Sequence, residues 1–407
     1  MVGNASLLKD INRSLIINEI RKNAPISRAD LIVTTGLTLP TVLRNINNLI
    51  EEGYIIEVGK GESLAGRKPV MLTINPNVAR IIGISIGRKL EVILTDFNGI
   101  LLDSIVDNET TDEDTLPRDL ASLVFNMTSK LLQKHQLTTN DVAGIGIGMP
   151  GMNFKIGTSA VPQYFRTAWA GRNKDPYEYF IEQFRDFRCV LMEHVTICGA
   201  LGEQWFGKTV DSRNNVYFTI ETGMGCGIII NNQIYTGRDG FAGHIGHTVI
   251  DPDGVECYCG NRGCLETLTG IPYILDNCTV MLKSGKSSSL TSRMDGNIDT
   301  LTFQMVAEEA QNCDPLCVEV LSKAGEALGI GIANAINTLN PDKIVLGGTV
   351  PWSSSLFVEK AIASARNLVF SNKARDVEVT VSDTQFHSEA RGAVALVLRE
   401  MYKSPQL

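Results

Sequence analysis

The sequence predicts an α/β protein, with an N-terminal winged helix-turn-helix followed by two α/β lobes that form a ligand cleft. Three observations predict this fold class. Apolar residues at helical spacing, interrupted by turn residues, fill roughly the first 50 positions, and two short strands with a basic tip follow them. Beyond residue 78, buried strands alternate with helical segments in two loosely repeated halves. One His and three Cys gather in the second of these halves.

The composition is that of a globular protein with two or three domains, because 43% of the 407 residues are hydrophobic and 20% are charged. No apolar run approaches the roughly 18 residues of a membrane span, and the N-terminus has no apolar signal region, so we expect neither. The nine Cys are dilute, which favours a reducing, cytoplasmic location.

The charge is uneven along the chain. The net charge of −8 argues against general nucleic-acid binding. Residues 1–75, however, contain nine Lys or Arg and seven Asp or Glu, so they carry about +2 and the remainder about −10. A DNA-binding module at the N-terminus is consistent with this asymmetry.

The first two helices are delimited by turn and capping residues. Apolar residues after Ser14 predict a helix that ends near Asn23, before Pro25. Ser27, with Asp30 three positions later, is typical of the N-cap of a second helix. A sharp turn at residues 35–37 follows and leads to a third helix.

The third helix is predicted to begin after Thr38 and to carry Pro40 in its first turn. Its apolar stripe consists of Val42, Ile46, Leu49 and Ile50. In a helix-turn-helix this helix enters the major groove of DNA. The residues on it that we expect to contact bases or phosphates of operator DNA are Thr38, Thr41, Arg44 and Asn45.

Strands at residues 53–59 and 70–74 predict a wing whose tip contains Arg67 and Lys68. Both basic residues are candidates for DNA contact, because a narrow, AT-rich minor groove attracts an inserted Arg. The alternative is a small helical domain with a charged hairpin exposed to solvent.

The remaining chain is predicted to form two lobes, and the domain boundaries follow from the change in pattern. We expect the winged helix-turn-helix at 1–78, the first lobe at 79–198 plus about 387–407, and the second at 199–386. Predicted strands lie at 81–86, 89–95, 100–102, 142–147, 189–192, 216–220, 228–230 and 343–348, and predicted helices at 117–135, 201–205 and 324–339. A loop with Gly223, Gly225 and Gly227 is weak evidence for phosphate binding, because tight strand packing explains it equally well.

A metal site is predicted from His247, Cys257, Cys259 and Cys264, which fall within 18 residues. Three thiolates and one imidazole are the ligands of a four-coordinate structural zinc, and Gly260 and Gly263 permit the bends that bring them together. The alternative is a set of buried free thiols.

From Asn12 to Arg391 the chain resembles the ROK family, which unites bacterial sugar kinases with sugar-responsive repressors. The motifs that carry this resemblance are Gly-His-Ile-Gly-His at 243–247, the Cys-rich segment at 257–266 and Leu-Gly-Glu at 201–203. The helix-turn-helix and Gly-Arg-Lys-Pro at 66–69 make it similar to the xylose-, glucose- and N-acetylglucosamine-responsive repressors. The resemblance implies lobes like those of sugar kinases, Hsp70 and actin, and a homodimer or homotetramer.

Departures from the kinase pattern predict that the chain is not an enzyme and has no catalytic residue. ROK kinases hold the sugar with an Asn-Asp pair, whose Asp is the general base; the matching positions are His194 and Val195. Valine accepts no proton. Ser85 stands where the phosphate motif normally has Asp, and Arg88 follows where that motif has small residues.

The resemblance implies that the effector lies near His194, His244, His247 and Glu266. In the family, His244 is usually a sugar-binding Glu, and His247 lies near both zinc and sugar. Glu266 is expected to accept hydrogen bonds from sugar hydroxyls; alternatively it is a helix-start carboxylate. Two imidazoles in place of two carboxylates favour an acceptor-rich or anionic ligand that binds more tightly at pH 6 than at pH 8. A pocket that has drifted after losing its ligand is the alternative.

The function predicted from these features is a DNA-binding repressor of carbohydrate genes, controlled by a sugar or sugar-derived effector in a kinase-like cleft without catalysis. Two alternatives remain from sequence alone. One is a repressor without a small ligand, controlled by a partner protein such as a sugar-transport component. The other is an active sugar kinase with an appended DNA-binding module.

Overall fold

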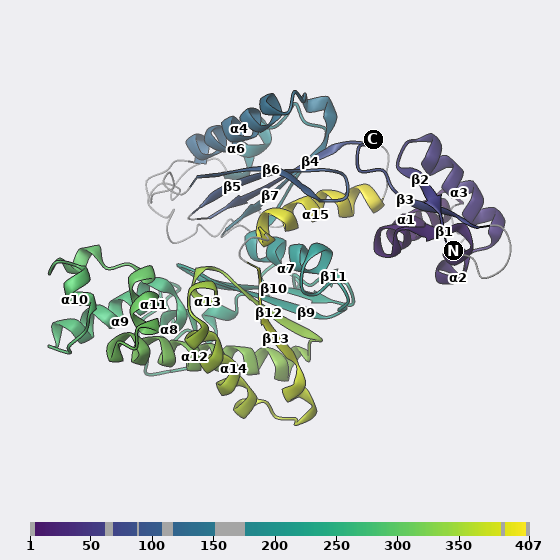
Figure 1. The fold of residues 1–407 in the computed structure, drawn as a ribbon. Helices are drawn as coiled ribbons and strands as arrows, with labels where there is room; N and C mark the ends of the chain where they lie inside the picture. The colour runs from purple at the N-terminus through teal and green to yellow at the C-terminus, as the bar shows by residue number, and fades with distance from the viewer. Residues whose placement is uncertain are drawn as a thin grey trace. The chain divides into compact units, whose positions relative to one another are not determined.

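The computed structural model describes residues 5–61, 68–87, 89–107, 117–150, 176–383 and 387–403 (Figure 1). The chain divides into two compact units. The first contains the chain up to Ile147, a segment that ends at Met192 and the C-terminal residues from Ala393; the second contains Glu193–Gly392. None of the helices in the described ranges is long and apolar enough to cross a membrane.

The N-terminal winged helix-turn-helix is confirmed. It consists of α1 (Ala5–Asn23), α2 (Arg28–Thr35), α3 (Leu39–Glu51) and a three-stranded sheet in the order β1 (Ile26–Ser27), β3 (Val70–Ile74), β2 (Ile55–Lys60). Ser27 and Asp30 form the predicted capping box, and Gly36 ends α2 with a φ of 66°. The apolar residues at helical spacing are fully buried: Ile16, Ile17, Ile20, Leu31, Val42, Ile46 and Leu49.

Two features of this domain differ from the sequence prediction. Helix α1 begins at Ala5, well before Ser14, and its first turns carry Leu8 and Ile11 on the exposed side. Strand β1 was not predicted, since two residues are too few to show a strand pattern; its Ile26 and Ser27 pair with Leu72 and Met71.

The first lobe contains a sheet in the order β6 (Leu101–Asp107), β5 (Leu90–Thr95), β4 (Arg80–Ile86), β7 (Val142–Met149), β8 (Val190–His194). Helices α4 (Pro117–Lys134) and α6 (Pro176–Gln183) lie on one face and α15 (Ser388–Lys403) on the other (Figure 1). Gly146 lets α15 approach β7 closely, because a Cβ there would lie 1.8 Å from the Ala393 oxygen. Strand β6 runs past the predicted end at residue 102.

Aromatic residues join the winged domain to the first lobe within this unit. The ring centroids of Tyr54 and Phe97 are 5.8 Å apart, and those of Phe97 and Tyr402 are 6.1 Å apart, edge to face. All three side chains are buried. Because Tyr402 belongs to α15, the C-terminal helix is part of the same aromatic cluster as the base of the wing.

The second lobe contains a sheet in the order β11 (Gln233–Ile234), β10 (Met224–Ile230), β9 (Asn215–Ile220), β12 (Lys343–Gly347), β13 (Glu378–Val381). Strand β12 runs parallel to β9 and β13, and β10 runs antiparallel to β9. Figure 1 shows α7 (Val195–Phe206) on one face and α12 (Pro315–Leu339) with α14 (Ser355–Leu368) on the other. The remaining helices are α8 (Glu266–Thr269), α9 (Ile271–Lys283), α10 (Leu290–Arg293), α11 (Phe303–Gln311) and α13 (Thr349–Ser353).

The glycine-rich segment after β9 is mainly strand rather than loop. Gly225 and Gly227 lie in β10, which begins four residues earlier than predicted. A Cβ on Gly227 would lie 2.3 Å from the backbone carbonyl oxygen of Thr196, so this glycine allows β10 to contact α7. Tight packing, the alternative that we considered from the sequence, therefore accounts for these two glycines.

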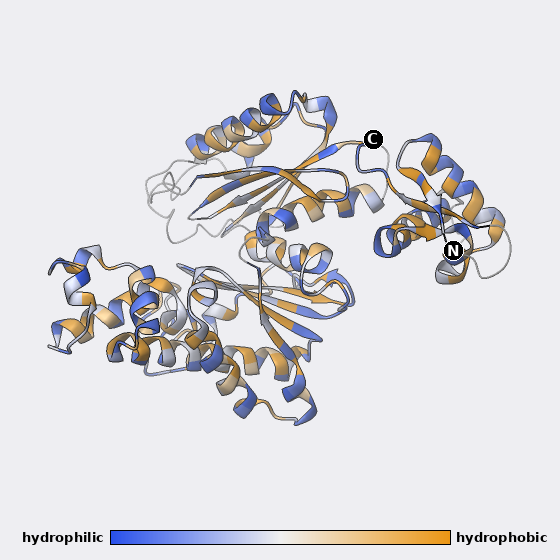
Figure 2. Ribbon diagram, in the orientation of Figure 1, coloured by the Kyte–Doolittle hydropathy of each residue, from blue (hydrophilic) through white to orange (hydrophobic). Residues whose placement is uncertain are grey.

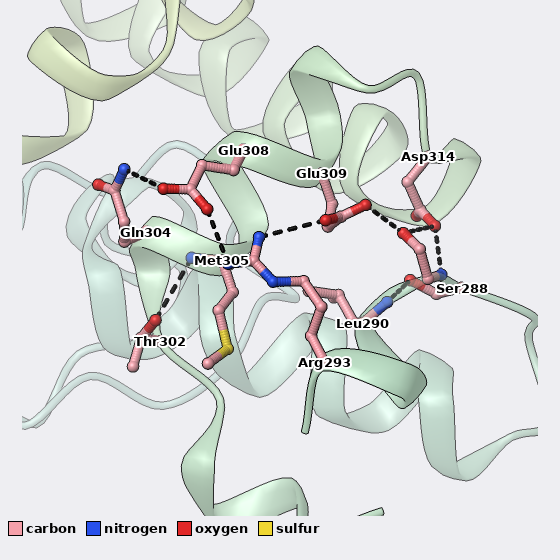
Figure 3. A network of polar contacts seen from close by, with 10 residues as sticks. Ser288, Leu290, Arg293, Thr302, Gln304, Met305, Glu308, Glu309 and Asp314 are labelled. Carbon is pink, nitrogen blue, oxygen red and sulfur yellow. Dashed lines mark hydrogen bonds and ion pairs between the residues drawn. The ribbon is translucent and has the colours of Figure 1, made fainter. Parts of the chain in front are cut away.

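A polar network holds the small helices of the second lobe together (Figure 3). The Ser289 hydroxyl donates to Glu309 and Asp314, and Arg293 pairs with Glu308 and Glu309. Because these residues come from α10, α11 and the N-caps of α10 and α12, the network holds the three helices against one another.

The strands of both large sheets are mainly apolar, whereas the helices show hydrophilic and hydrophobic sides (Figure 2).

Candidate metal centre, effector site and nucleic-acid interface

The four predicted metal ligands come together in the second lobe. His247 ends a short 3-10 helix, η3 (Ile245–His247), and the three Cys lie on a turn that follows. Gly260 and Gly263 have φ values of 93° and 66°, as the bends of this turn require. A Cβ on Gly263 would lie 1.4 Å from the Asp251 oxygen, so only glycine fits there.

The geometry fits a tetrahedral zinc ion. The four ligand atoms lie within 4.8 Å of one another. The Sγ atoms of Cys259 and Cys264 are 3.6 Å apart, and Nδ1 of His247 is 3.6 Å from Sγ of Cys257. Zn–S bonds of about 2.3 Å place neighbouring sulfurs about 3.8 Å apart in a tetrahedron. His247, Cys257, Cys259 and Cys264 are therefore close enough together to hold one zinc ion.

The electrostatics of the thiols also point to a cation. Burial and the neighbouring Cys thiols raise the pKa of Cys264 to about 12, so this thiol stays protonated in the protein alone. A dication reverses this preference by stabilising the thiolates. Three sulfurs and one imidazole are the four ligands that a structural zinc site uses.

The second nitrogen of His247 is also engaged. Its Nε2 lies 3.0 Å from the Tyr258 hydroxyl, an arrangement that orients a metal-bound imidazole. Nδ1 therefore lies toward the sulfurs and Nε2 toward Tyr258. This arrangement fits the metal role, and the second role near the sugar that the resemblance implies stays a prediction.

His194 presents a hydrogen-bond donor. It is the N-cap of α7, and its Nδ1 accepts the backbone N–H of Thr196 at 3.2 Å and the Thr196 hydroxyl at 2.7 Å. A neutral ring whose Nδ1 accepts carries its proton on Nε2. Burial and the nearby His244 lower the pKa of His194 to about 4, so the ring is neutral at physiological pH.

His244 presents an acceptor beside it. The ring centroids of His194 and His244 are 6.3 Å apart. Nδ1 of His244 lies 2.9 Å from the carbonyl oxygen of Phe241, so Nδ1 donates and, in the neutral ring, Nε2 accepts. The ring of Phe241 stands edge-on to that of His244, with centroids 5.8 Å apart, and its side chain is exposed.

Glu266 is a buried carboxylate with one oxygen free for a ligand. Its Oε2 accepts the backbone N–H of Met224 at 2.8 Å, whereas Oε1 is buried and has no hydrogen-bond partner among the described residues. Burial raises the pKa of Glu266 to about 7. Glu266 also begins α8, as the alternative interpretation expected, but that helix has only four residues and does not satisfy Oε1.

Two of the positions that depart from the kinase pattern lie in regular elements. Val195 is the first residue of α7. Ser85 lies within β4, opposite Glu91 of β5. Arg88 falls outside the described residues. Glu193, at the end of β8, uses a carboxylate oxygen to accept the His194 backbone N–H at 3.0 Å.

The recognition helix α3 exposes fewer of the predicted DNA contacts than we expected. Arg44 is exposed and Thr41 is half-buried; the hydroxyl of Thr41 lies 3.0 Å from that of exposed Thr38. Asn45 is only 3% exposed, and its amide nitrogen donates to the backbone carbonyl oxygen of Thr41 at 2.8 Å. Its side chain lies on the core side of the helix, which does not favour the contact with DNA that the sequence predicts.

Asn47 is exposed on α3, three residues after Arg44, and was missed by the sequence analysis. Counting helical positions from Arg44 would have found it, since the two residues share the face opposite Val42 and Ile46. Lys68 is exposed and lies two residues before β3, at the tip end of the wing. Arg67 falls outside the described residues.

Two family models match the chain. One, described as the ROK family, matches residues 81–400, and one, described as winged helix-turn-helix DNA-binding, matches residues 9–56. The chain is 31% identical to the xylose repressor of Caldicellulosiruptor bescii over 407 residues, which cover 100% of both chains. It is 28% identical to the DNA-binding transcriptional dual regulator NagC of Escherichia coli, over 98% of this chain and 95% of the relative.

Solved structures agree with the sequence comparisons. A ROK family transcriptional regulator described as a homologue of the E. coli MLC protein superimposes with a TM-score of 0.79, at 26% identity, over 98% of this chain and 97% of that one. A ROK family glucokinase from Streptomyces griseus matches 78% of this chain and 99% of its own, with a TM-score of 0.64 and 22% identity. The second likeness shows the fold of the two lobes alone.

Proposed function

The chain belongs to the ROK family as a DNA-binding repressor of sugar-utilisation genes, and we propose that a carbohydrate bound in the second lobe releases it from its operator. The observation that carries the proposal is the full-length match to a protein named a xylose repressor, with a winged helix-turn-helix in the same chain. Exposed Arg44 and Lys68 would contact the DNA, and we propose that Thr38, Thr41 and Arg67 contact it as well.

The effector is proposed to be a neutral, hydroxyl-bearing sugar. A hydroxyl both accepts and donates, and the two rings offer one donor, Nε2–H of His194, and one acceptor, Nε2 of His244. Glu266 adds an acceptor through Oε1. This polarity differs from the anionic ligand that the sequence favoured, because that interpretation needed imidazolium and burial keeps His194 neutral.

Catalysis is not part of the proposed function. A sugar kinase needs a base for the attacking hydroxyl, and the residue that follows His194 is Val195. The relatives that match over their full length, described above, are regulators, and the kinase structure matches at lower identity. The two lobes are therefore proposed to bind sugar and change operator affinity without turnover. We propose a homodimer or homotetramer with a structural zinc in each chain, held by the four ligands named above.

The test is operator release. An operator is selected from random duplexes, labelled, and its anisotropy with the protein is followed during titration with neutral pentoses, hexoses and N-acetylated amino sugars, and with their acid and phosphate forms. At least one neutral sugar should weaken operator binding by about tenfold or more. Release only by acids or phosphates would refute the neutral-sugar proposal. No release by any compound would refute control by a sugar and favour a partner protein.

A substitution tests whether the release of the operator by sugar depends on the His194 ring. His194→Leu removes the donor and should raise the sugar concentration for half-release by about tenfold, without changing operator affinity in the absence of sugar. His135→Gln is a matched control in the first lobe, where Nε2 of His135 lies 2.8 Å from Asp103. Equal effects of the two substitutions would show that the first acts through stability rather than through a ligand contact.

A further inference from the structure

Two loops that are far apart in the sequence meet at the carboxyl ends of two neighbouring strands in the second-lobe sheet. Strands β9 and β12 are parallel neighbours, with Gly347 opposite Thr219, so their carboxyl ends lie side by side. In α/β sheets the crevice beyond such ends is the common place for ligands, and phosphate groups bind there to backbone N–H groups of glycine-rich turns. Glu221 follows β9, and Gly348-Thr349 follows β12.

The Glu221 side chain lies between the two loops, where it contacts Thr349. Its Oε1 accepts the backbone N–H of Thr349 at 2.5 Å and the Thr349 hydroxyl at 2.8 Å. One carboxylate oxygen thus takes two donors of the kind that a phosphate oxygen takes in a nucleotide-binding turn. Gly348 makes the close approach possible, because a Cβ there would lie 2.4 Å from the Ile220 oxygen and its φ is 97°.

Hydrogen bonds hold the backbone of Glu221 in place. Its N–H donates to the Gly223 oxygen at 3.0 Å, and its carbonyl accepts the N–H of Ile271 at 2.9 Å. On the other loop, the indole of Trp352 donates to the Ser382 oxygen at 3.0 Å and holds α13 in place. Other hydrogen bonds therefore hold both of the loops that contribute the Glu221–Thr349 contact.

We infer that Glu221 is a built-in occupant of an anion site, and that its carboxylate excludes the polyphosphate of a nucleotide from the carboxyl ends of β9 and β12. A phosphate group brought to Thr349 would have to displace the carboxylate and would meet its negative charge. Removal of the carboxylate leaves both Thr349 donors for an external anion. This contact is independent of the operator and effector contacts, since it involves none of the residues assigned to them.

Inorganic pyrophosphate is the probe. The full-length protein, Glu221→Ala, Glu221→Gln and the control Glu359→Ala are titrated with pyrophosphate at constant ionic strength, and melting temperature and heat of binding are measured. Glu359 lies on the exposed side of α14, so its substitution removes an equal charge elsewhere. Glu221→Ala should melt earlier than the unmodified protein. Pyrophosphate should restore it, with a half-saturating concentration at least about ten times lower than for the other three proteins.

Glu221→Gln separates charge from contact, because its amide oxygen still accepts from Thr349. It should remain closed to pyrophosphate. Equal binding by the unmodified protein would show that the site is open and would overturn the inference. A folded Glu221→Ala protein without a saturable response would overturn it as well. If the alanine variant folds poorly, Glu221→Ser is used; failure of both to gain stability from pyrophosphate means that an anion does not replace the carboxylate.

Discussion

His194 caps helix α7 through its side chain, with Nδ1 accepting the Thr196 backbone N–H at 3.2 Å. An imidazolium has no lone pair at Nδ1, so protonation destroys this cap. The folded-state pKa of about 4 is below the ordinary histidine value of 6.5, which means that the unfolded chain binds the proton first as the pH falls. The contribution of neutral His194 to stability is present above pH 6.5 and is lost progressively between pH 6.5 and 4.

We predict from this relationship that His194→Gln flattens the stability profile between pH 6.5 and 4. Urea denaturation of both proteins is measured at several pH values in that window, and the difference between their unfolding free energies is plotted. The difference isolates His194 from other titrating groups, including the metal ligands. A parallel decline of the two proteins with falling pH would contradict the assignment of a neutral, capping ring.

Zinc is predicted to depend on Cys259. Cys259→Ser replaces a thiolate by a hydroxyl, a much weaker zinc ligand, and should lower the bound zinc from about one equivalent per chain to a small fraction. The melting temperature should fall by several degrees. Metal content is measured after purification without chelators. Cys313→Ser is the control, since Cys313 is exposed and outside the ligand cluster. Unmodified protein free of zinc would refute the site.

The outer face of α3 is predicted to bind the operator. Arg44→Ala should weaken operator binding by roughly 1–3 kcal/mol if Arg44 contacts a base, and Asn47→Ala should weaken it on the same face. Asn45→Ala should instead cost about 1 kcal/mol of stability, since its hydrogen bond to Thr41 is buried, and leave the affinity of folded protein unchanged. Anisotropy titrations and urea denaturation separate the two effects. A loss of affinity confined to Asn45→Ala would reverse our assignment of the faces.

The wing is predicted to act mainly through charge. Lys68→Ala should lower the slope of the logarithm of affinity against the logarithm of salt concentration by about 1, similarly for all operator sequences. Arg67→Ala should weaken binding most where the DNA under the wing is AT-rich. Titrations at four salt concentrations with AT-rich and GC-rich flanks measure both. Unchanged affinity for Arg44→Ala and Arg67→Ala together would refute the winged-helix mode of binding.

Kinase activity is predicted to be absent, and Val195→Asp is predicted not to create it. The substitution restores a carboxylate at the start of α7, but Ser85 remains in place of the Asp of the phosphate motif, and Glu221 still contacts Thr349. Transfer of labelled phosphate from ATP to glucose or a related hexose is measured for both proteins. Transfer by the unmodified protein would overturn the non-catalytic assignment.

The sequence by itself determined the features that depend on neighbours along the chain. The four zinc ligands lie within 18 residues, so their chemistry and spacing were visible without a fold. The Ser27–Asp30 capping box and the apolar stripe of α3 are local in the same way, and both were predicted correctly.

Only the tertiary structure decided the features that depend on contacts between distant residues. Glu221 and Thr349 are 128 positions apart, and their hydrogen bonds exist because β9 and β12 are parallel neighbours. Burial, together with His244 from 50 positions away, lowers the pKa of His194, and for this reason we propose a neutral sugar rather than an anion as the effector. Burial and long-range pairing come from the packing of whole elements, and residue type and spacing along one chain do not specify them.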